Sequence, residues 1–489
     1  MNTFLSCIRK ITRYPKQSSE LNLLRKSALF DANWYMANNP DVAKTEMDPL
    51  LHYYRYGGFE GRDPSLKFSS SWYLDAYKDV KKAGINPLVH YLKYGRTEGR
   101  STHIASIQSY DTNETTLAHS FLSAYISEIA SNIYNDYEDN YDSYRFGQPI
   151  KEVHKTTPKT IFPGILSKKN FDHPNFLTRI LVNAIGLIEP FLSRFDAIFT
   201  QLADNESRNI YIKVLAYRAL GPQKVKLPLN TPNYWNGIKA IENLADFSNP
   251  ILYPFSNFNW TLPMINLQQI SVPVNLYATP KAVYTQFVLE QYKCVSGQTT
   301  IGVENGDTVI DAGACWGDTA LYFAYHSGQD GRVFSYEFVP RNLEIFSKNL
   351  ALNPQLSDRV SIVEHAAWNN SGQILHFGDN GPGTSVSSVS VNNNDAIETL
   401  SIDDLVKVKK ISRVDFIKMD IEGSELKALQ GAIKTIKKHR PRLAICIYHQ
   451  LIDFTEIPEF ILSLDLGYRL YIRHYTIHAE ETILFAKAT

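Results

Sequence analysis

The sequence is poor in cysteine. Its four cysteines stand far apart among 489 residues, at Cys7, Cys294, Cys315 and Cys446. None forms a C-x-x-C pair or lies near histidines at zinc-binding spacing, which argues against both a zinc site and a disulfide framework. Reduced thiols are typical of cytoplasmic proteins, so a cytoplasmic location is expected.

The sequence also lacks an excess of charge and a long apolar run. Fifty basic and fifty acidic side chains give a formal net charge of zero, so we expect no nucleic acid as a partner. No run approaches the ~20 apolar residues of a membrane span, so no integral membrane segment is expected. Residues 1–16 lack the apolar core of a signal peptide. Peripheral attachment to the inner face of the membrane stays open.

A chain of this length, 44% hydrophobic, is expected to form two to four domains. The pattern predicts five parts: an N-terminal tail (1–26), a two-copy helical repeat module (27–104), a tyrosine-rich linker region (105–175), a helical cap with its lead-in (176–300), and an α/β domain (301–489). Apolar residues recur at helical spacing early in the cap. Strand-like segments follow near 224–229 and 272–283.

An internal repeat spans about residues 30–100. The copies read FDANWYMANNPDVAKTEMDPLLHYYRYGGFEGR and FSSSWYLDAYKDVKKAGINPLVHYLKYGRTEGR, at a constant offset of 38 (72 − 34 for the tryptophans). Each copy predicts two short helices, the second opened by proline and closed by glycine. His52 and His90 recur inside an apolar-aromatic helix, so we interpret them as packing residues rather than metal ligands.

The segment 307–337 carries the clearest sign of a ligand site. A short apolar strand ends in Asp311, and the turn holds Gly313 and Gly317. A helix opens at Asp318, and a second strand ends in Glu337. Such a β-turn-α-β unit binds nucleotide-like ligands at the carboxyl end of its strand.

The spacing within this unit favours S-adenosylmethionine over a dinucleotide. The pattern is D-x-G-x-x-x-G, with Cys315 where a dinucleotide fingerprint has its middle glycine. Asp311 at the strand end would repel a pyrophosphate but suits a sulfonium or an amino group. Glu337 follows Gly317 by 20 residues (337 − 317), a spacing that suits ribose recognition by either cofactor. A ligand-free unit, in which Asp318 only caps its helix, stays open.

Strands and helices alternate in the rest of the α/β domain. The expected strands are 360–364, 414–419, 442–448, 468–472 and 482–486. The short link between the last two implies a hairpin with an antiparallel final strand. We therefore predict a doubly wound, seven-stranded Rossmann-like sheet closed by an antiparallel strand.

Several motifs together resemble a known family. They are DAGACWGDT, the acidic Glu337, the loop GTSVSSV, FIKMDIEGSELKALQGA, and ICIYH with the late strands. This set, over about residues 205–489, is similar to FkbM-type S-adenosylmethionine-dependent methyltransferases of the class I fold. The resemblance implies methylation of hydroxyl groups on polyketides or sugars. The N-terminal repeat resembles modules of bacterial surface-polysaccharide proteins, which implies that setting.

The candidate site residues follow from the strand ends, where open α/β sheets place their ligands. The cofactor-binding candidates are Asp311, Gly313, Gly317, Asp318, Glu337, Glu364 and Ala366. The candidate general base is first His449, whose pKa is naturally suited to that work, and second Asp420. The acceptor-binding candidates are Ser385, Glu422, Arg473 and His474.

Other interpretations of these residues stay open. Asp420 could instead cap the next helix, and His449 could be held in a loop. Asp420 and Glu422 could also bind a divalent cation.

These patterns predict an S-adenosylmethionine-dependent O-methyltransferase that acts on a sugar hydroxyl in a glycan or polysaccharide precursor. The repeats could bind a protein partner. Two other functions stay open. One is an NAD-dependent sugar-modifying enzyme, and the other is a catalytically inactive scaffold of a polysaccharide assembly.

Overall fold

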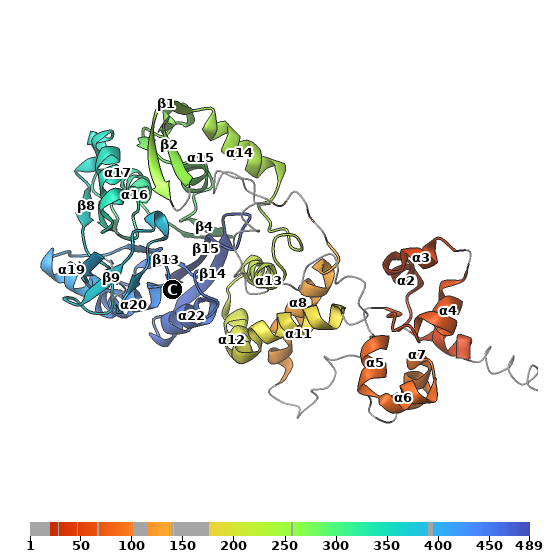
Figure 1. Ribbon diagram of the computed structural model, residues 1–489. Coiled ribbons are helices and arrows are strands. Elements are labelled where there is room, and N and C mark those ends of the chain that lie inside the picture. Colours follow the sequence, from red (N-terminus) through yellow and green to blue (C-terminus); the bar gives the residue numbers. More distant parts are fainter. Residues whose placement is uncertain are drawn as a thin grey trace, which may run out of the picture. The chain divides into compact units, whose positions relative to one another are not determined.

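The computed structural model describes residues 20–489 apart from 28, 46, 66–67, 97, 99, 101–114, 136, 138–139, 141–175, 256–257 and 390–394. The chain divides into two compact units. One comprises residues 1–115 and 164–182, and the other comprises residues 116–163 and 183–489. Figure 1 shows the helices and strands of each unit. No helix of the described residues is both long and apolar enough to cross a bilayer.

The repeat module contains the same four elements in each copy, where two helices were predicted. The first copy holds α2 (Ala32–Asn38), α3 (Pro40–Ala43), α4 (Pro49–His52) and η1 (Tyr53–Gly57). The second holds α5 (Ser70–Ala76), α6 (Lys78–Ala83), α7 (Pro87–His90) and η2 (Tyr91–Gly95). A helical turn at residues 20–26 contributes Leu24, which is fully buried, to the same core. The module therefore begins before the predicted boundary at 27. Residues 1–19 of the predicted tail lie outside the described residues.

A tyrosine, a histidine and a glycine meet in the same way in both copies. The hydroxyl of Tyr35 lies 3.1 Å from Nδ1 of His52, and that of Tyr73 lies 3.1 Å from Nδ1 of His90. The packing role predicted for the two histidines is confirmed. A Cβ at Gly95 would stand 2.2 Å from the hydroxyl of Tyr73, so only glycine fits there.

Helices open the second unit, where a linker region and a helical cap were predicted. They are α8 (Thr115–Asn132), the second half of α11 (Phe176–Ile188), α12 (Leu192–Gln201), α13 (Asn205–Leu220) and α14 (Pro232–Glu242). The phenolic group of Tyr125 in α8 donates a hydrogen bond to the carbonyl of Ala184 in α11. The predicted linker region thus contains an 18-residue helix, and its part from 141 to 175 lies outside the described residues.

The cap is not wholly helical. The strands β1 (Ala245–Phe255), β2 (Phe258–Asn266) and β3 (Asn275–Tyr277) form an antiparallel sheet. The strands β1 and β2 were not predicted, because the prolines at 250, 254 and 263 interrupt the apolar alternation that marks strands. The strand expected at 224–229 is a turn region without a strand, and that expected at 272–283 is the short β3 followed by α15 (Pro280–Val283).

The central sheet has seven strands, as predicted. They are β6 (Thr308–Ala312), β7 (Arg332–Tyr336), β8 (Val360–Val363), β12 (Phe416–Met419), β13 (Arg442–Cys446), β14 (Tyr468–His474) and β15 (Thr482–Ala488). Their order is β14-β15-β13-β12-β6-β7-β8. The strand β15 pairs antiparallel with both β13 and β14, whereas the pairs from β13 to β8 are parallel. The predicted antiparallel final strand is confirmed.

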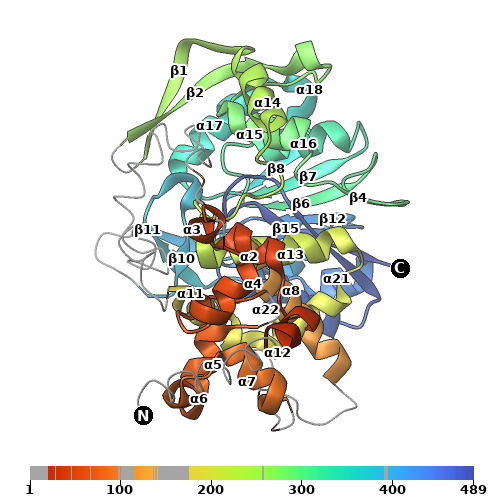
Figure 2. The same ribbon diagram turned by 90° about the vertical axis from the view of Figure 1, so that its right-hand side faces the viewer.

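Helices cover both faces of this sheet. Figures 1 and 2 show α16 (Asp318–His326) and α17 (Pro340–Ala351) on one side, and α20 (Glu425–Gln430), α21 (Ile433–His439) and α22 (Asp453–Ser463) on the other. The strands β6, β12 and β13 are almost wholly buried, and each reads as a near-continuous apolar run, as expected for parallel strands covered on both faces. Two polar exceptions, Asp311 and Lys418, stand out in that core.

Candidate functional site

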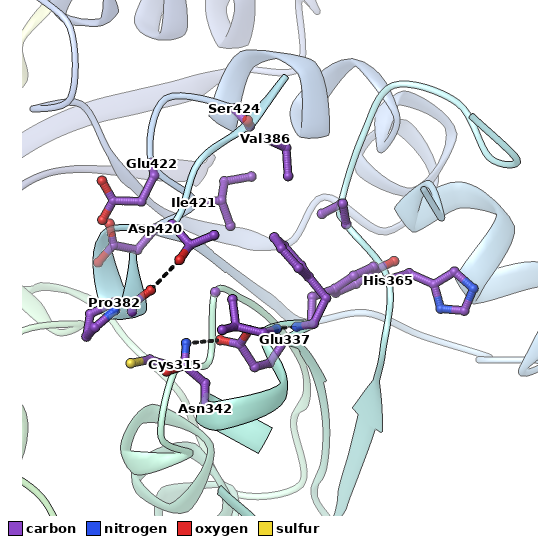
Figure 3. A pocket seen from close by; sticks show the side chains of 18 residues that line it. Cys315, Glu337, Asn342, His365, Pro382, Val386, Asp420, Ile421, Glu422 and Ser424 are labelled. Carbon is purple, nitrogen blue, oxygen red and sulfur yellow. Dashed lines mark hydrogen bonds between the residues drawn. The ribbon is translucent and has the colours of Figure 1, made fainter. Parts of the chain in front are cut away.

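A pocket opens at the carboxyl ends of the parallel strands β6, β7 and β12. Its lining is Gly313, Cys315, Tyr336, Glu337, Phe338, Val339, Asn342, His365, Ala366, Ala367, Gly381, Pro382, Thr384, Val386, Asp420, Ile421, Glu422 and Ser424. In Figure 3, Glu337 and Cys315 lie on one side of the pocket, and Asp420 and Glu422 on another.

The glycine turn after β6 is shaped by a close backbone approach. Gly313 has φ of +86°, and a Cβ there would stand 1.9 Å from the carbonyl oxygen of Asp420. Cys315 in the same turn also has a positive φ, of +48°, which is uncommon for a residue with a side chain. The turn therefore packs directly against the end of β12, and only glycine at 313 allows it.

A buried ion pair stabilises this turn. Nζ of Lys418 lies 3.3 Å from Oδ1 of Asp311 and donates hydrogen bonds to the carbonyls of Ala312 and Gly313. The other carboxylate oxygen of Asp311 accepts hydrogen bonds from the hydroxyls of Thr319 and Ser335. Burial alone would lower the pKa of Lys418, but the nearby carboxylates raise it, so the lysine stays charged. Asp311 is fully buried and does not line the pocket.

The carboxylate of Glu337 lies at the end of β7, inside the pocket. Its Oε1 accepts hydrogen bonds from the amides of Phe338 and Val339, at 2.6 and 2.7 Å, and its Oε2 accepts one from Nδ2 of Asn342. Burial raises the pKa of Glu337 to about 7, against the opposing effect of these donors. A group that accepts hydrogen bonds, such as this carboxylate, suits the paired hydroxyls of a ribose.

Asp420 follows β12 on the opposite side. The buried phenol of Tyr448 donates a 2.9 Å hydrogen bond to its Oδ1. Nε2 of His449 lies 3.5 Å from the same oxygen and 3.4 Å from Oε2 of Glu422, while Nδ1 lies 3.1 Å from Oε1 of Glu425. The predicted pair Asp420 and Glu422 thus belongs to a cluster of three carboxylates around one imidazole.

His449 does not line the pocket, and its side chain is 8% exposed. Burial lowers its pKa, but the carboxylates of Glu422, Glu425 and Asp420 outweigh burial and raise the pKa to about 11. The expectation of an imidazole with a near-neutral pKa was wrong, because the sequence did not reveal that three acids face the ring. Of the two candidate bases, only Asp420 reaches the pocket.

Of the remaining predicted cofactor residues, one lines the pocket and three lie outside its lining. Ala366 lines the pocket, while Glu364 is exposed and outside the lining. Gly317 lies against α17, since a Cβ there would stand 2.0 Å from Cδ2 of Phe346. Asp318, also outside the lining, opens α16, and burial raises its pKa to about 6.

Three of the four predicted acceptor residues lie outside the lining; Glu422 lines it. Arg473 is buried, and its Nη2 forms ion pairs with Asp204 and Glu206 of the preceding loop and α13. Nδ1 of His474 lies 2.9 Å from Oγ1 of Thr482 on β15. Ser385 is exposed between Thr384 and Val386, which both line the pocket.

Sequence reasoning missed several residues of the site. Lys418 stands inside an apolar strand, and its charge two positions before Asp420 was the available signal. Tyr448 precedes His449 after β13, and His365 follows Glu364 after β8. At both places the neighbouring residue was predicted instead. Asn342 lies one turn into α17, and only the fold brings it to Glu337.

The sheet order and the pocket at the strand ends define a Rossmann-like α/β domain of the methyltransferase class. Residues 311–470 match the family model described as the methyltransferase FkbM domain. This part of the chain is therefore similar to FkbM methyltransferases, and the resemblance predicted from the C-terminal motifs is confirmed. That of the N-terminal repeat stays a prediction.

Solved structures of methyltransferases are also similar to this chain. An FkbM methyltransferase from Methylobacillus flagellatus KT is 16% identical, with a TM-score of 0.41, over 76% of this chain and 100% of that one. An O-methyltransferase from Bacillus cereus, in complex with SAH, is 13% identical, with a TM-score of 0.27, over 45% of this chain and 86% of that one. No curated protein matches the sequence. The family assignment rests on the domain match alone.

Proposed function

We propose that the chain is an S-adenosylmethionine-dependent O-methyltransferase whose acceptor is a sugar hydroxyl in a glycan or polysaccharide precursor. One observation carries the proposal. A buried carboxylate suited to a ribose, Glu337, and a carboxylate suited to a hydroxyl proton, Asp420, line one pocket at the ends of neighbouring parallel strands. The proposal keeps the cytoplasmic location and the possible protein partner of the repeats as predicted.

The residues present fit the methyl donor. Glu337 would accept hydrogen bonds from its ribose hydroxyls, and the backbone of Gly313 lines the same pocket. Phe338 and Ala366 offer apolar surface of the kind that an adenine ring needs. Asp311 and Lys418 would not touch the donor. They stabilise the glycine turn that lines the pocket.

When bound, S-adenosylmethionine supplies a methyl group on a sulfonium, which a nucleophilic oxygen can attack. Asp420 would take the hydroxyl proton as the acceptor oxygen gains the methyl group and the donor is released as S-adenosylhomocysteine. The hydrogen bond from Tyr448 to Oδ1 fixes the orientation of that carboxylate and leaves Oδ2 for the proton. A positioned base of this kind contributes about 10²–10⁴-fold to the rate.

We assign the base to Asp420 in place of His449, the first choice from the sequence. Asp420 lines the pocket, whereas His449 lies behind it with both ring nitrogens facing carboxylates. The choice of a sugar as acceptor rests on the resemblance of the N-terminal repeat and on the hydroxyl chemistry that the family implies.

Two measurements test the proposal. Calorimetry with the full chain should show binding of S-adenosylhomocysteine and none of NAD, and the reverse would favour the NAD-dependent enzyme. Mass spectrometry of host glycans with and without the gene should show the loss of one methyl group. If the donor product binds but no glycan changes, the inactive scaffold gains support.

A further inference from the structure

Basic side chains gather on one surface of the sheet domain, although the chain as a whole carries no net charge. Four of the seven residues 407–413 and four of the seven residues 434–440 are Lys or Arg, and neither segment contains an acid. In the whole chain, only 50 of 489 residues are Lys or Arg, so both segments are far above the average. The eight cations, here called the basic surface, are all exposed: Lys407, Lys409, Lys410, Arg413, Lys434, Lys437, Lys438 and Arg440.

Two neighbouring helices bring the two segments together. The carboxylate of Asp403, in α19 (Ile402–Val408), accepts hydrogen bonds from two backbone amides at the start of α21. Beyond the other end of α19, the amide of Val414 donates a 2.9 Å hydrogen bond to Nδ1 of His439, the last residue of α21. The two helices therefore begin together and end together, and their exposed cations form one continuous surface.

Few acids neutralise this surface. Among the described residues, only Arg413 of the eight cations forms an ion pair, with Asp415. The two acids of α19 are engaged elsewhere, since Asp403 binds the amides of α21 and Asp404 accepts hydrogen bonds from two serine hydroxyls. The positive charge of the surface is therefore left to face solvent.

Stabilisation of the helices does not account for this set of cations. Lys437 and Lys438 lie in the last turn of α21, where the helix dipole favours a cation. Lys434 lies in the first turn, where the dipole disfavours one. It also stands three and four residues before the other two, and like charges at that spacing destabilise a helix. A negatively charged partner would relieve this repulsion.

An apolar side chain stands among the cations. Val408, between Lys407 and Lys409, is 69% exposed, the largest exposed fraction among the large hydrophobic residues that the structure describes. Neither segment contains the aromatic residues on which single-stranded nucleic acids stack. A bilayer surface with anionic headgroups can receive both features, because its headgroups attract lysines and its acyl boundary receives an apolar side chain.

We propose that the basic surface, with Val408 among its cations, binds a bilayer that carries anionic lipid headgroups. The segments 407–413 and 434–440 precede β12 and β13, so the surface lies near the amino ends of these strands. The pocket opens at the carboxyl ends of the parallel strands. Binding to a bilayer would therefore leave the pocket accessible, and the proposal is independent of the proposed function.

The test is co-sedimentation of the full chain with two kinds of vesicle. One consists of phosphatidylcholine, and the other also contains about 30% phosphatidylglycerol, an anionic lipid. We expect binding to the anionic vesicles only. Raising the salt from about 0.1 M to about 1 M shortens the screening length from about 10 Å to about 3 Å, and binding should then be lost.

Variants locate the binding on the chain. A lysine near an anionic surface strengthens binding about fivefold, so Lys437→Gln with Lys438→Gln should weaken it about 25-fold. Adding Lys407→Gln and Lys409→Gln should bring the loss to at least about 100-fold. A matched control, Lys239→Gln with Lys348→Gln, removes two exposed lysines of α14 and α17 and should change nothing. An unchanged midpoint of thermal unfolding shows that the variants are folded.

Val408→Asn distinguishes a bilayer from a soluble polyanion. It removes the apolar side chain without changing the charge, and should weaken vesicle binding about tenfold while leaving binding to heparin unchanged. Absence of binding to anionic vesicles, equal binding by the wild type and the fourfold variant, or no effect of Val408→Asn overturns the proposal. Affinity for S-adenosylhomocysteine should be the same in all variants, and its absence in the wild type would count against the proposed function alone.

Discussion

In the repeat module, every buried side-chain polar atom of the described residues has a hydrogen-bond partner, whereas at the pocket of the sheet domain several have none. In the module, Tyr35 pairs with His52 and Tyr73 with His90. Near the pocket, His449 and Nδ1 of His365 are buried without a hydrogen-bond partner. Satisfied groups stabilise a fold by themselves, while unsatisfied ones mark where something else binds. We therefore expect the module to be stabilised by its own contacts, and the pocket to be completed by a ligand.

The largest expected effect tests whether the pocket acids serve chemistry. Asp420→Asn keeps the shape of the side chain but removes the proposed base, so turnover should fall about 10²–10⁴-fold. Affinity for S-adenosylhomocysteine should stay within about threefold, since a base contributes to the transition state and little to donor binding. Single-turnover kinetics and calorimetry measure the two. The control Asp358→Asn changes an exposed acid and should leave both unchanged. Turnover near the wild-type rate in Asp420→Asn would end the assignment.

The second prediction concerns a buried charge in the sheet domain that is paired with an opposite charge. Lys418→Met leaves the charge of Asp311 buried without its cation, which should lower the free energy of unfolding by about 3–5 kcal/mol. Urea unfolding measures the loss. The double variant Lys418→Met with Asp311→Asn removes the stranded charge and should recover part of it. If the single variant is as stable as the wild type, the pair does not hold the turn.

The third prediction follows from the pKa of Glu337, raised to about 7. The carboxylate is ionised above that pH and protonated below it. Ribose hydroxyls need the ionised, accepting form, so affinity for S-adenosylhomocysteine should fall as pH drops below about 7, at most about tenfold per pH unit. Calorimetry between pH 8 and 5.5 measures this slope. Glu337→Gln should bind weakly and lose the slope, and a slope that persists in this variant would assign it to another group.

The smallest expected effect lies in the module. Gly95→Ala would place a Cβ 2.2 Å from the hydroxyl of Tyr73, and overpacking of this kind costs about 1–3 kcal/mol. Thermal unfolding measures the loss. Adding Tyr73→Phe removes the clashing oxygen, so the double variant should lose less than the sum of the two single changes. Affinity for S-adenosylhomocysteine should not change in either, and a change would mean that the module also serves the pocket.

The sequence allowed the sheet to be predicted because each parallel strand is a short apolar run that ends in an acid, a glycine or a histidine. The antiparallel final strand followed from the short link after residue 474. The strands β1 and β2 were missed, since three prolines break their alternation.

Only those site residues that directly follow a strand could be predicted from the sequence. Glu337 and Asp420 line the pocket because each directly follows a parallel strand. Asp311 also ends a strand, but its side chain turns to Lys418, a contact between two strands that no local pattern reveals. The environment of His449 depends on the turn at Glu422 and Gly423, whose positive φ values no spacing rule indicates.

The position of β15 has a consequence for how the chain folds as it is made. Within the central sheet, β14 pairs only with β15, and β15 also pairs with β13. Until residues 482–488 have left the ribosome, β14 has no neighbour in that sheet, and β13 presents an open edge. The hydrophobic core of the repeat module, by contrast, lies within residues 21–92. We therefore expect the module to fold during synthesis, while the methyltransferase sheet exposes an unpaired edge to other chains and to chaperones until its last strand arrives.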